Sequence, residues 1–218
     1  MIAKAKKKSP GIVARRERIV EQTRKLIATQ GIKNIRMRAL AEQCNVATAT
    51  LYNQFGSRDG IIAAALEADF RGRFEPLSQK TESLLPSEKI RQRIELTATD
   101  VTQLKDYTRS VMFFYFHHET IDSLRSMIHD FVAEDFLEII YQIKELGDLA
   151  DWVRADEFAD DIVTELYSLS MKWTQGYIPQ ADLYMRLMQS ACASFIGIST
   201  GKTKREFEQI ISSLNLHR

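Results

Sequence analysis

Hydrophobic side chains recur every three or four positions along most of this chain, the spacing that places them on one face of an α-helix. The chain has 218 residues, of which only nine are Gly and four are Pro. The pair Asp59-Gly60 lies inside a helical pattern rather than between alternating segments, so it does not indicate a β-hairpin. The pattern therefore predicts an all-α protein.

The first helix is expected just after a short arm. Residues 1–11 are rich in Lys and end in Ser-Pro-Gly, a composition typical of disorder. The apolar stripe that follows runs from Ile12 to Ile27, and Gly31 supplies a permissive backbone where a helix commonly ends.

Two short helices come next, around Leu40 and Leu51, and the spacing leaves only a tight turn between them. Ser57 is a candidate N-cap for a longer helix over residues 57–75, which we expect to link an N-terminal head to a larger body.

Past Pro76, six further helical patterns follow. They are separated by breaks that combine a helix terminator with a residue suited to starting a helix. Their expected ranges are 87–104, 106–118, 120–146, 155–176, 180–198 and 203–214. The body is therefore predicted to be a helical bundle.

The pair of short helices has the residues that a helix-turn-helix requires. Ala41 is small enough for two helices to cross closely, and Asn45 tolerates the left-handed backbone of a sharp turn. Val46 and Leu51 are expected to face inward and hold the second helix in place. Its outward face is then free to enter a major groove of DNA, where Thr and Asn can bond base edges.

The expected DNA contacts comprise this outward face and flanking side chains that reach phosphates. They are Arg36, Arg38, Thr48, Ala49, Thr50, Tyr52, Asn53 and Arg58. The charge distribution supports this assignment. Residues 1–60 hold 13 Lys and Arg against 4 Asp and Glu, a balance of +9, whereas the rest of the chain holds 17 against 25, a balance of −8. Binding of such a basic head to DNA should weaken as salt rises.

Residues Arg16–Ile62 resemble the N-terminal domain of the tetracycline-repressor (TetR) family. The matching stretches are Arg16–Val20, Leu40–Glu42, Val46–Phe55 and Gly56–Asp59. Their spacing, the Leu-Tyr-x-x-Phe run and the following Ser-Arg agree together. The resemblance implies a helical regulatory and dimerisation domain after the head.

Three positions depart from the family pattern. Arg36 occupies a place where a capping Ser or Thr is usual, Asn45 replaces Gly, and Thr48 replaces a frequent Lys. The expected organisation is a disordered basic arm over 1–11, a helix-turn-helix domain over 12–56 and a ligand-binding and dimerisation domain over 57–218.

An aromatic-rich segment in the body is a candidate ligand pocket. Aromatic side chains on several faces of one helix cannot all enter one tight core, so some are expected to line an apolar cavity. The candidates are Phe74, Phe113, Phe116, His117, Met127 and Phe131. Ordinary core packing is the alternative. A metal site built on the i, i+4 pair His118 and Asp122 is disfavoured, because the other candidate ligands share no common face.

The helical patterns over 155–176 and 180–198 carry more apolar residues than one monomer readily covers. A four-helix bundle formed with a second subunit would bury them, which is also what the resemblance implies. The candidate interface residues are Leu166, Trp173, Leu187, Ala191 and Phe195. An internal core of a single chain is the alternative reading.

Other classes of function find little support in the sequence. Cys44 and Cys192 are too few for a disulfide framework, and no segment is apolar enough to cross a membrane, so we expect a cytoplasmic protein. No phosphate loop, nucleophile elbow or metalloprotease motif is present, and we expect no enzyme activity, cofactor or metal.

The sequence therefore predicts a homodimeric repressor that binds a palindromic operator in double-stranded DNA and is released by a small, largely apolar effector. The alternative is an architectural or cell-division factor on the same fold that is controlled by a protein partner.

Overall fold

The computed structural model describes residues 10–81, 84–117 and 122–215. Apart from an isolated bridge between Leu149 and Ser199, the regular structure of these residues is helical, and the all-α prediction is confirmed. The helices are α1 (Pro10–Gln30), η1 (Ile32–Asn34), α2 (Met37–Gln43), α3 (Thr48–Phe55), α4 (Arg58–Thr81), α5 (Pro86–Gln103), α6 (Lys105–Phe116), α7 (Asp122–Glu145), α8 (Ala155–Thr174), η2 (Gln180–Asp182), α9 (Leu183–Ile198) and α10 (Gly201–Asn215). None of the described helices is long and apolar enough to span a membrane.

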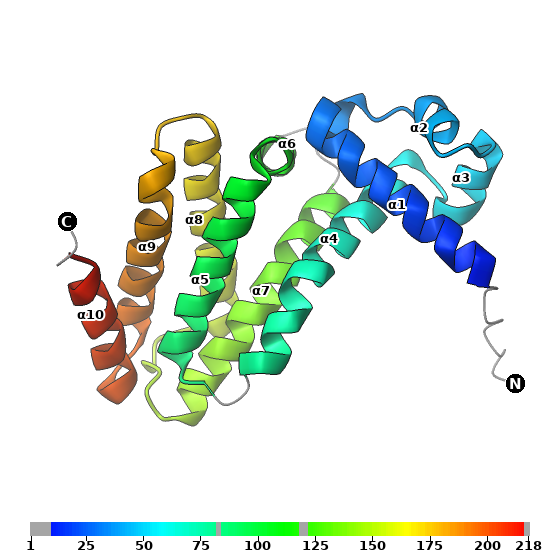
Figure 1. Ribbon diagram of the computed structural model, residues 1–218. Helices are drawn as coiled ribbons and strands as arrows, with labels where there is room; N and C mark the ends of the chain where they lie inside the picture. Colours follow the sequence, from blue (N-terminus) through cyan, green and yellow to red (C-terminus); the bar gives the residue numbers. More distant parts are fainter. Residues whose placement is uncertain (1–9, 82–83, 118–121, 216–218) are drawn as a thin grey trace, which may run out of the picture.

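Helices α1 to α3 form a head that lies at one end of the molecule, and α5 to α10 form the body (Figure 1). Ile19, Ile27, Leu40 and Leu51 are completely buried and form the centre of the head. Helix α1 begins at Pro10, slightly before its predicted start, because proline suits the first turn of a helix. The rest of the expected arm, residues 1–9, lies outside the described residues.

Helix α4 leaves the head and runs into the body (Figure 1). Ser57 precedes it, and its hydroxyl accepts a hydrogen bond from the Gly60 N–H at 3.0 Å, so the predicted N-cap is confirmed. The helix extends through Pro76 to Thr81, beyond its predicted end at residue 75. Proline within a helix removes one hydrogen bond and strains the preceding turn but does not always end the helix.

Gly60 is required where α4 passes the end of α3. A Cβ atom at this position would lie 2.1 Å from the Phe55 carbonyl oxygen, so no other residue fits without moving the backbone. This contact sets how closely the third helix of the head packs against the connecting helix.

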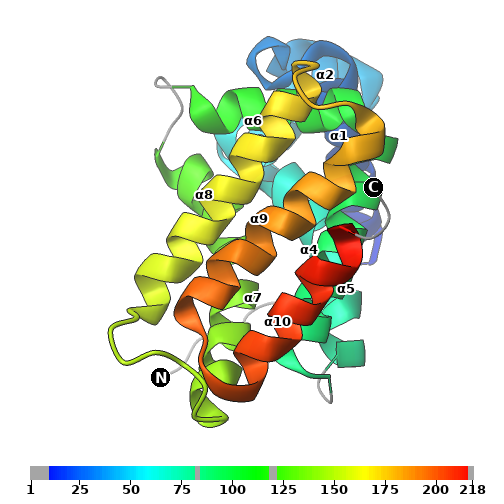
Figure 2. The same ribbon diagram turned by 90° about the vertical axis from the view of Figure 1, so that its left-hand side faces the viewer.

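The body is a bundle in which α8, α9 and α10 lie side by side across one face (Figure 2). The Phe195 ring is at the centre of its aromatic core, 5.2 Å from the Phe207 ring, 5.3 Å from Phe158 and 6.4 Å from Phe136. Because Phe207 belongs to α10, this last helix covers apolar surface of α9.

This packing corrects the expectation about the dimer interface. All five side chains proposed for it are buried within the single chain: Leu166, Trp173, Leu187, Ala191 and Phe195. Helical periodicity identifies which face of a helix is buried but not whether the same chain or a second one buries it. Here helices of the same chain do so.

The loop between α7 and α8 is tied to the start of α10. The Asp148 carboxylate accepts the Thr203 N–H at 2.8 Å, and the Asp148 carbonyl accepts the Thr200 N–H at 2.7 Å. The first of these bonds, made to the ionised carboxylate, holds the pKa of Asp148 below its ordinary value. Asp148 therefore caps a helix that begins about fifty residues further along the chain.

Candidate nucleic-acid interface and internal cavity

The turn between α2 and α3 has the conformation that the sequence predicts. Asn45 has a φ of 51°, in the left-handed region. The next residue, Val46, donates its N–H to the Ala41 carbonyl oxygen at 3.0 Å, and Ala41 itself is buried where the two helices meet. These contacts hold α3 against α2 across a tight turn, as in a helix-turn-helix.

Helix α3 presents the predicted outward face. Leu51 is completely buried against the head, whereas Ala49, Tyr52 and Asn53 are exposed and Thr48 and Thr50 are half-buried. A short helix with one fully buried anchor and small or amide side chains on the opposite face matches the shape and chemistry of a DNA major groove.

The three predicted arginines have different surroundings. Arg36 and Arg38 are exposed at the start of α2, and Arg38 forms a solvent-exposed ion pair with Glu42 at 3.3 Å, which contributes little energy. Arg58 is instead engaged within the protein. It donates to the Ile35 carbonyl at 2.8 Å and to the Ile32 carbonyl at 2.5 Å, so it clamps α4 to the segment around η1.

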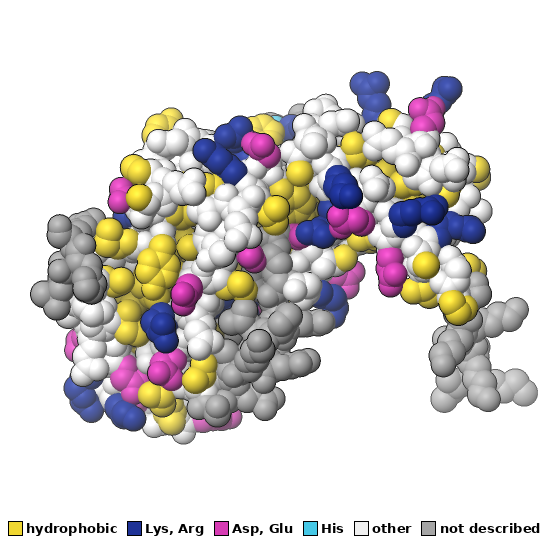
Figure 3. Space-filling model, in the orientation of Figure 1, with side chains coloured by type: hydrophobic (Ala, Val, Ile, Leu, Met, Phe, Trp, Pro, Cys, Tyr) yellow, Lys and Arg dark blue, Asp and Glu magenta, His cyan; other side chains and the backbone are white. Residues whose placement is uncertain are grey.

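Two other arginines have a structural role that the sequence reasoning missed. Arg16 donates to the Gln54 carbonyl at 3.0 Å and lies 4.3 Å from the Phe55 ring centre, and Arg18 donates to the Cys44 carbonyl at 3.3 Å. Cations near the last carbonyls of a helix satisfy acceptors that have no helical partner. Lys and Arg side chains are prominent over the head (Figure 3), but these two also fasten α1 to α2 and α3.

Cys44, at the end of α2, is buried, and burial raises the pKa of its thiol. A thiol with a raised pKa is less reactive, which agrees with a packing role rather than redox sensing.

Polar side chains of the head contact helices α4 and α6. Arg24 of α1 pairs with Asp69 of α4, whose carboxylate is completely buried. Lys33 of η1 lies 2.8 Å from the His117 ring at the end of α6 and 5.3 Å from the centre of the Phe113 ring. The head is therefore connected to both α4 and α6.

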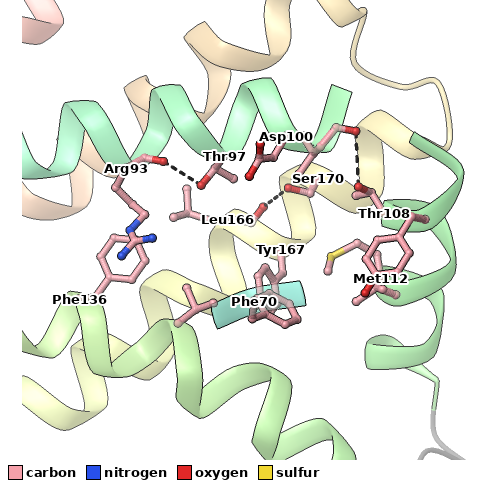
Figure 4. Close-up of a pocket in the computed structure, with 14 residues that line it drawn as sticks. Phe70, Arg93, Thr97, Asp100, Thr108, Met112, Phe136, Leu166, Tyr167 and Ser170 are labelled. Atoms are coloured by element: carbon pink, nitrogen blue, oxygen red, sulfur yellow. Dashed lines mark hydrogen bonds between the residues drawn. The ribbon is translucent and has the colours of Figure 1, made fainter. Parts of the chain in front are cut away.

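A cavity of about 60 Å³ lies between helices α4 to α8. Figure 4 shows its lining side chains. Helix α4 contributes Phe70, the inner face of α6 contributes Val111 and Met112, and Phe136 and Leu166 come from α7 and α8. These residues form apolar walls.

One wall of the cavity is polar. Arg93, Thr97 and Asp100 lie on the same face of α5, at i, i+4 and i+7. Arg93 is only 6% exposed and is paired with Asp135 of α7. Burial lowers the pKa of Arg93 to about 10, so it still carries its charge at neutral pH.

This cavity is lined by other residues than those the sequence analysis proposed for a ligand pocket. Phe113 and Phe116 are 50% and 42% exposed, and His117 contacts the head. Phe131 packs 6.0 Å from the Phe70 ring without lining the cavity. The side chains of Phe74 and Met127, like those of His118 and Asp122 considered for a metal, lie outside the described residues. Residues 111 and 112 of α6 face the cavity, and the neighbouring aromatic residues lie on other faces of that helix.

Comparison with known proteins agrees with this geometry. Residues 19–65 match the profile described as "Bacterial regulatory proteins, tetR family". The chain is 39% identical over 56 residues to the HTH-type transcriptional repressor KstR of Rhodococcus jostii, and 35% identical over 68 residues to KstR of Mycolicibacterium smegmatis. These matches cover 26% and 31% of each chain, so the chain spans less than a third of the curated relatives it matches.

Solved structures share most of the fold at lower identity. Thermus thermophilus FadR, a TetR-family repressor solved with lauroyl-CoA, superposes with a TM-score of 0.69 at 18% identity, over 84% of this chain and 94% of that one. Bacillus subtilis FadR, solved with stearoyl-CoA, gives 0.65 at 15% identity, over 80% and 96%. The N-terminal domain of this chain is therefore similar to that of the tetR family of bacterial regulatory proteins.

Proposed function

We propose that this protein is a homodimeric transcriptional repressor that binds a palindromic operator in double-stranded DNA and is released by a small, largely apolar ligand. The observation that carries the proposal is the exposed face of α3, with Tyr52 and Asn53 outward and Leu51 fixed inside. We assign DNA binding to residues 12–56, and ligand binding and dimerisation to 57–218, with no catalytic role.

The outer faces of α8 and α9 are the surface we propose for the second subunit. Ala193 and Gly197 are exposed and small, and the Glu165 carboxylate accepts hydrogen bonds from Ser190 and Ser194, which joins the two helices. Small residues allow helices of two subunits to approach closely in a four-helix bundle. A two-fold dimer would present its heads to half-sites about 34 Å apart.

Ligand control would act through the cavity. At about 60 Å³ it is far smaller than the several hundred Å³ that a small-molecule ligand occupies, so binding must move a wall. The walls formed by α4 and α6 also contact the head: Phe70 lines the cavity beside Asp69, which pairs with Arg24, and α6 carries both Met112 and His117. A ligand that favours displaced positions of α4 and α6 would lower operator affinity by its differential binding energy.

Selection of bound DNA from a random pool tests the DNA-binding proposal, and a palindromic consensus is the expected result. Asn53→Ala should then lower affinity for that operator about 10- to 100-fold, because it removes base contacts without touching the core. The matched control is Asn34→Ala, an exposed asparagine of the head that lies outside α3. Failure to enrich any sequence at low salt, or equal losses in both variants, would contradict the proposal.

The exposed rings of Phe113 and Phe116, together with the small cavity, favour a second candidate: a DNA-binding factor controlled by a protein partner. The two candidates differ in their response to small molecules. If compounds that bind the cavity leave operator affinity unchanged, control by a partner at this exposed patch is the better account.

A further inference from the structure

Arg93 and Asp100 lie at the two ends of the polar wall of the cavity, with Thr97 between them, and the other walls are mostly apolar. We infer that its ligand is a mostly apolar molecule with an acidic or carbonyl group at the Arg93 end and a hydroxyl group at the Asp100 end. The inference deepens the proposed function and rests on it, because it assumes that this cavity is the ligand site.

The first end donates hydrogen bonds. Arg93 keeps its charge although it is almost completely buried, and its planar guanidinium carries five N–H donors. Such a group can hold Asp135 and a second acceptor at the same time. A carboxylate or carbonyl oxygen of a ligand satisfies this geometry, whereas an apolar terminus would bury the guanidinium without any gain.

The second end accepts hydrogen bonds. Ser170 donates its proton to the Leu166 carbonyl at 3.0 Å, and Thr108 donates to the Val101 carbonyl at 3.4 Å. These two hydroxyls have used their protons, so they offer the cavity only oxygen lone pairs, and the nearby Asp100 carboxylate is also an acceptor when ionised (Figure 4). The Tyr107 hydroxyl, which can donate, lines the cavity as well, but acceptors predominate at this end. A ligand group that donates, such as a hydroxyl, is therefore the complementary partner.

The distance between the ends sets the length of the ligand. Arg93 and Asp100 are seven residues apart on α5, which corresponds to about 10 Å along the helix axis. Between these ends the polar wall carries Thr97, whose hydroxyl donates to the Arg93 carbonyl at 2.8 Å. Phe70, Phe136 and Met112 line the other walls without a charged group, so the middle of the ligand should be mostly apolar. A ligand with one polar end would place an apolar group against the polar side chains of the other end, which costs free energy.

Four probes of equal chain length test the inference by titration into the free protein, without DNA: ω-hydroxyoctanoate, octanoate, octanol and octanediol. The hydroxy acid should bind best. Loss of its hydroxyl should weaken binding about 5-fold, as expected for one hydrogen bond, and loss of its carboxylate about 10-fold or more, as expected for a charged one.

Variants assign each end. Asp100→Leu should remove the preference for ω-hydroxyoctanoate over octanoate, whereas Glu95→Gln, on the exposed side of α5, should leave it unchanged. The double variant Arg93→Met with Asp135→Leu, which leaves neither charge of the pair buried alone, should remove the preference for octanoate over octanol.

Equal affinity of the unaltered protein for octanoate and ω-hydroxyoctanoate, or no binding of any probe at millimolar concentration, would overturn the inference. Persistence of the hydroxyl preference in Asp100→Leu would also overturn it. A separate readout tests the proposed function: if ω-hydroxyoctanoate binds with the expected preference but does not release the operator, ligand control fails while the bipolar site stands.

Discussion

The head and the body of this protein use polar side chains in opposite ways. In the head, the polar residues of α3 are outside, and the short helix is held by Leu51 within and by Arg16 at its end. In the body, Arg93 and Asp100 point into a cavity, surrounded by apolar residues from several helices. The proposed surface site for DNA thus contrasts with the proposed internal site for a small ligand.

The same contrast predicts which substitutions should change binding and which should change the free energy of unfolding. Polar groups on the surface of the head are solvated, so their substitution should affect binding more than stability. Buried polar groups, such as Arg93 and Asp69, are desolvated and depend on their partners Asp135 and Arg24, so their substitution should affect stability directly. The Arg24–Asp69 pair, which joins the head to α4, contains such a buried group.

The largest expected effect tests the packing between α3 and α4. Gly60→Ala should lower the free energy of unfolding by about 3 kcal/mol or more, because its methyl would meet a backbone oxygen that cannot move alone. The matched control in the same helix is Gly72→Ala, where a Cβ meets nothing within 4 Å; it should raise stability by about 0.5–1 kcal/mol. Urea unfolding of both variants measures the difference, and equal changes would contradict the close approach.

The second prediction concerns the joint between head and body. Arg24→Met should destabilise the protein by about 3 kcal/mol, because it takes a cation away from the fully buried Asp69 carboxylate. Asp69→Asn should cost less, about 1 kcal/mol, because Arg24 is one-third exposed and also pairs with Glu21 at 2.9 Å. Denaturant midpoints compare the two; a larger loss in Asp69→Asn would show that the asymmetry of burial does not govern this pair.

A smaller effect is expected at the turn of the head. Asn45→Ala should lower stability by about 1 kcal/mol, because alanine tolerates the left-handed backbone less well than asparagine. Asn45→Gly should raise it by a few tenths of a kcal/mol for the converse reason. Thermal unfolding of the two variants checks the order, and operator affinity should change little if the helix angle is kept.

The smallest effect belongs to the body. The lowered pKa of Asp148 means that folding stabilises its ionised form. Asp148 therefore stabilises the folded protein at pH values above its ordinary pKa of 3.8, and this contribution is lost as the pH falls below that value. Asp148→Asn should therefore be less stable by about 0.5 kcal/mol at pH 7, since it removes a negative charge from the start of α10. The difference from the unaltered protein should shrink below pH 4; a constant difference would contradict the role of the charge.

Several features of this protein follow from the sequence by itself. The helical spacing predicts every helix of the body, and the residue types at Ala41 and Asn45 predict the close crossing and the left-handed turn of the head. These features depend on neighbours along the chain: helix faces, caps and turn conformations involve only a few consecutive residues. The outward face of α3 follows from the same periodicity.

Only the tertiary structure decided what the buried faces meet. Leu166 and Phe195 have the pattern of an interface, yet α10 and the other body helices cover them. Arg16 and Arg58 carry the positive charge that a phosphate contact needs, yet their side chains donate hydrogen bonds to backbone carbonyls. The cavity combines residues of five helices. Such contacts join positions far apart in the chain, and local periodicity specifies which face is buried but not its partner.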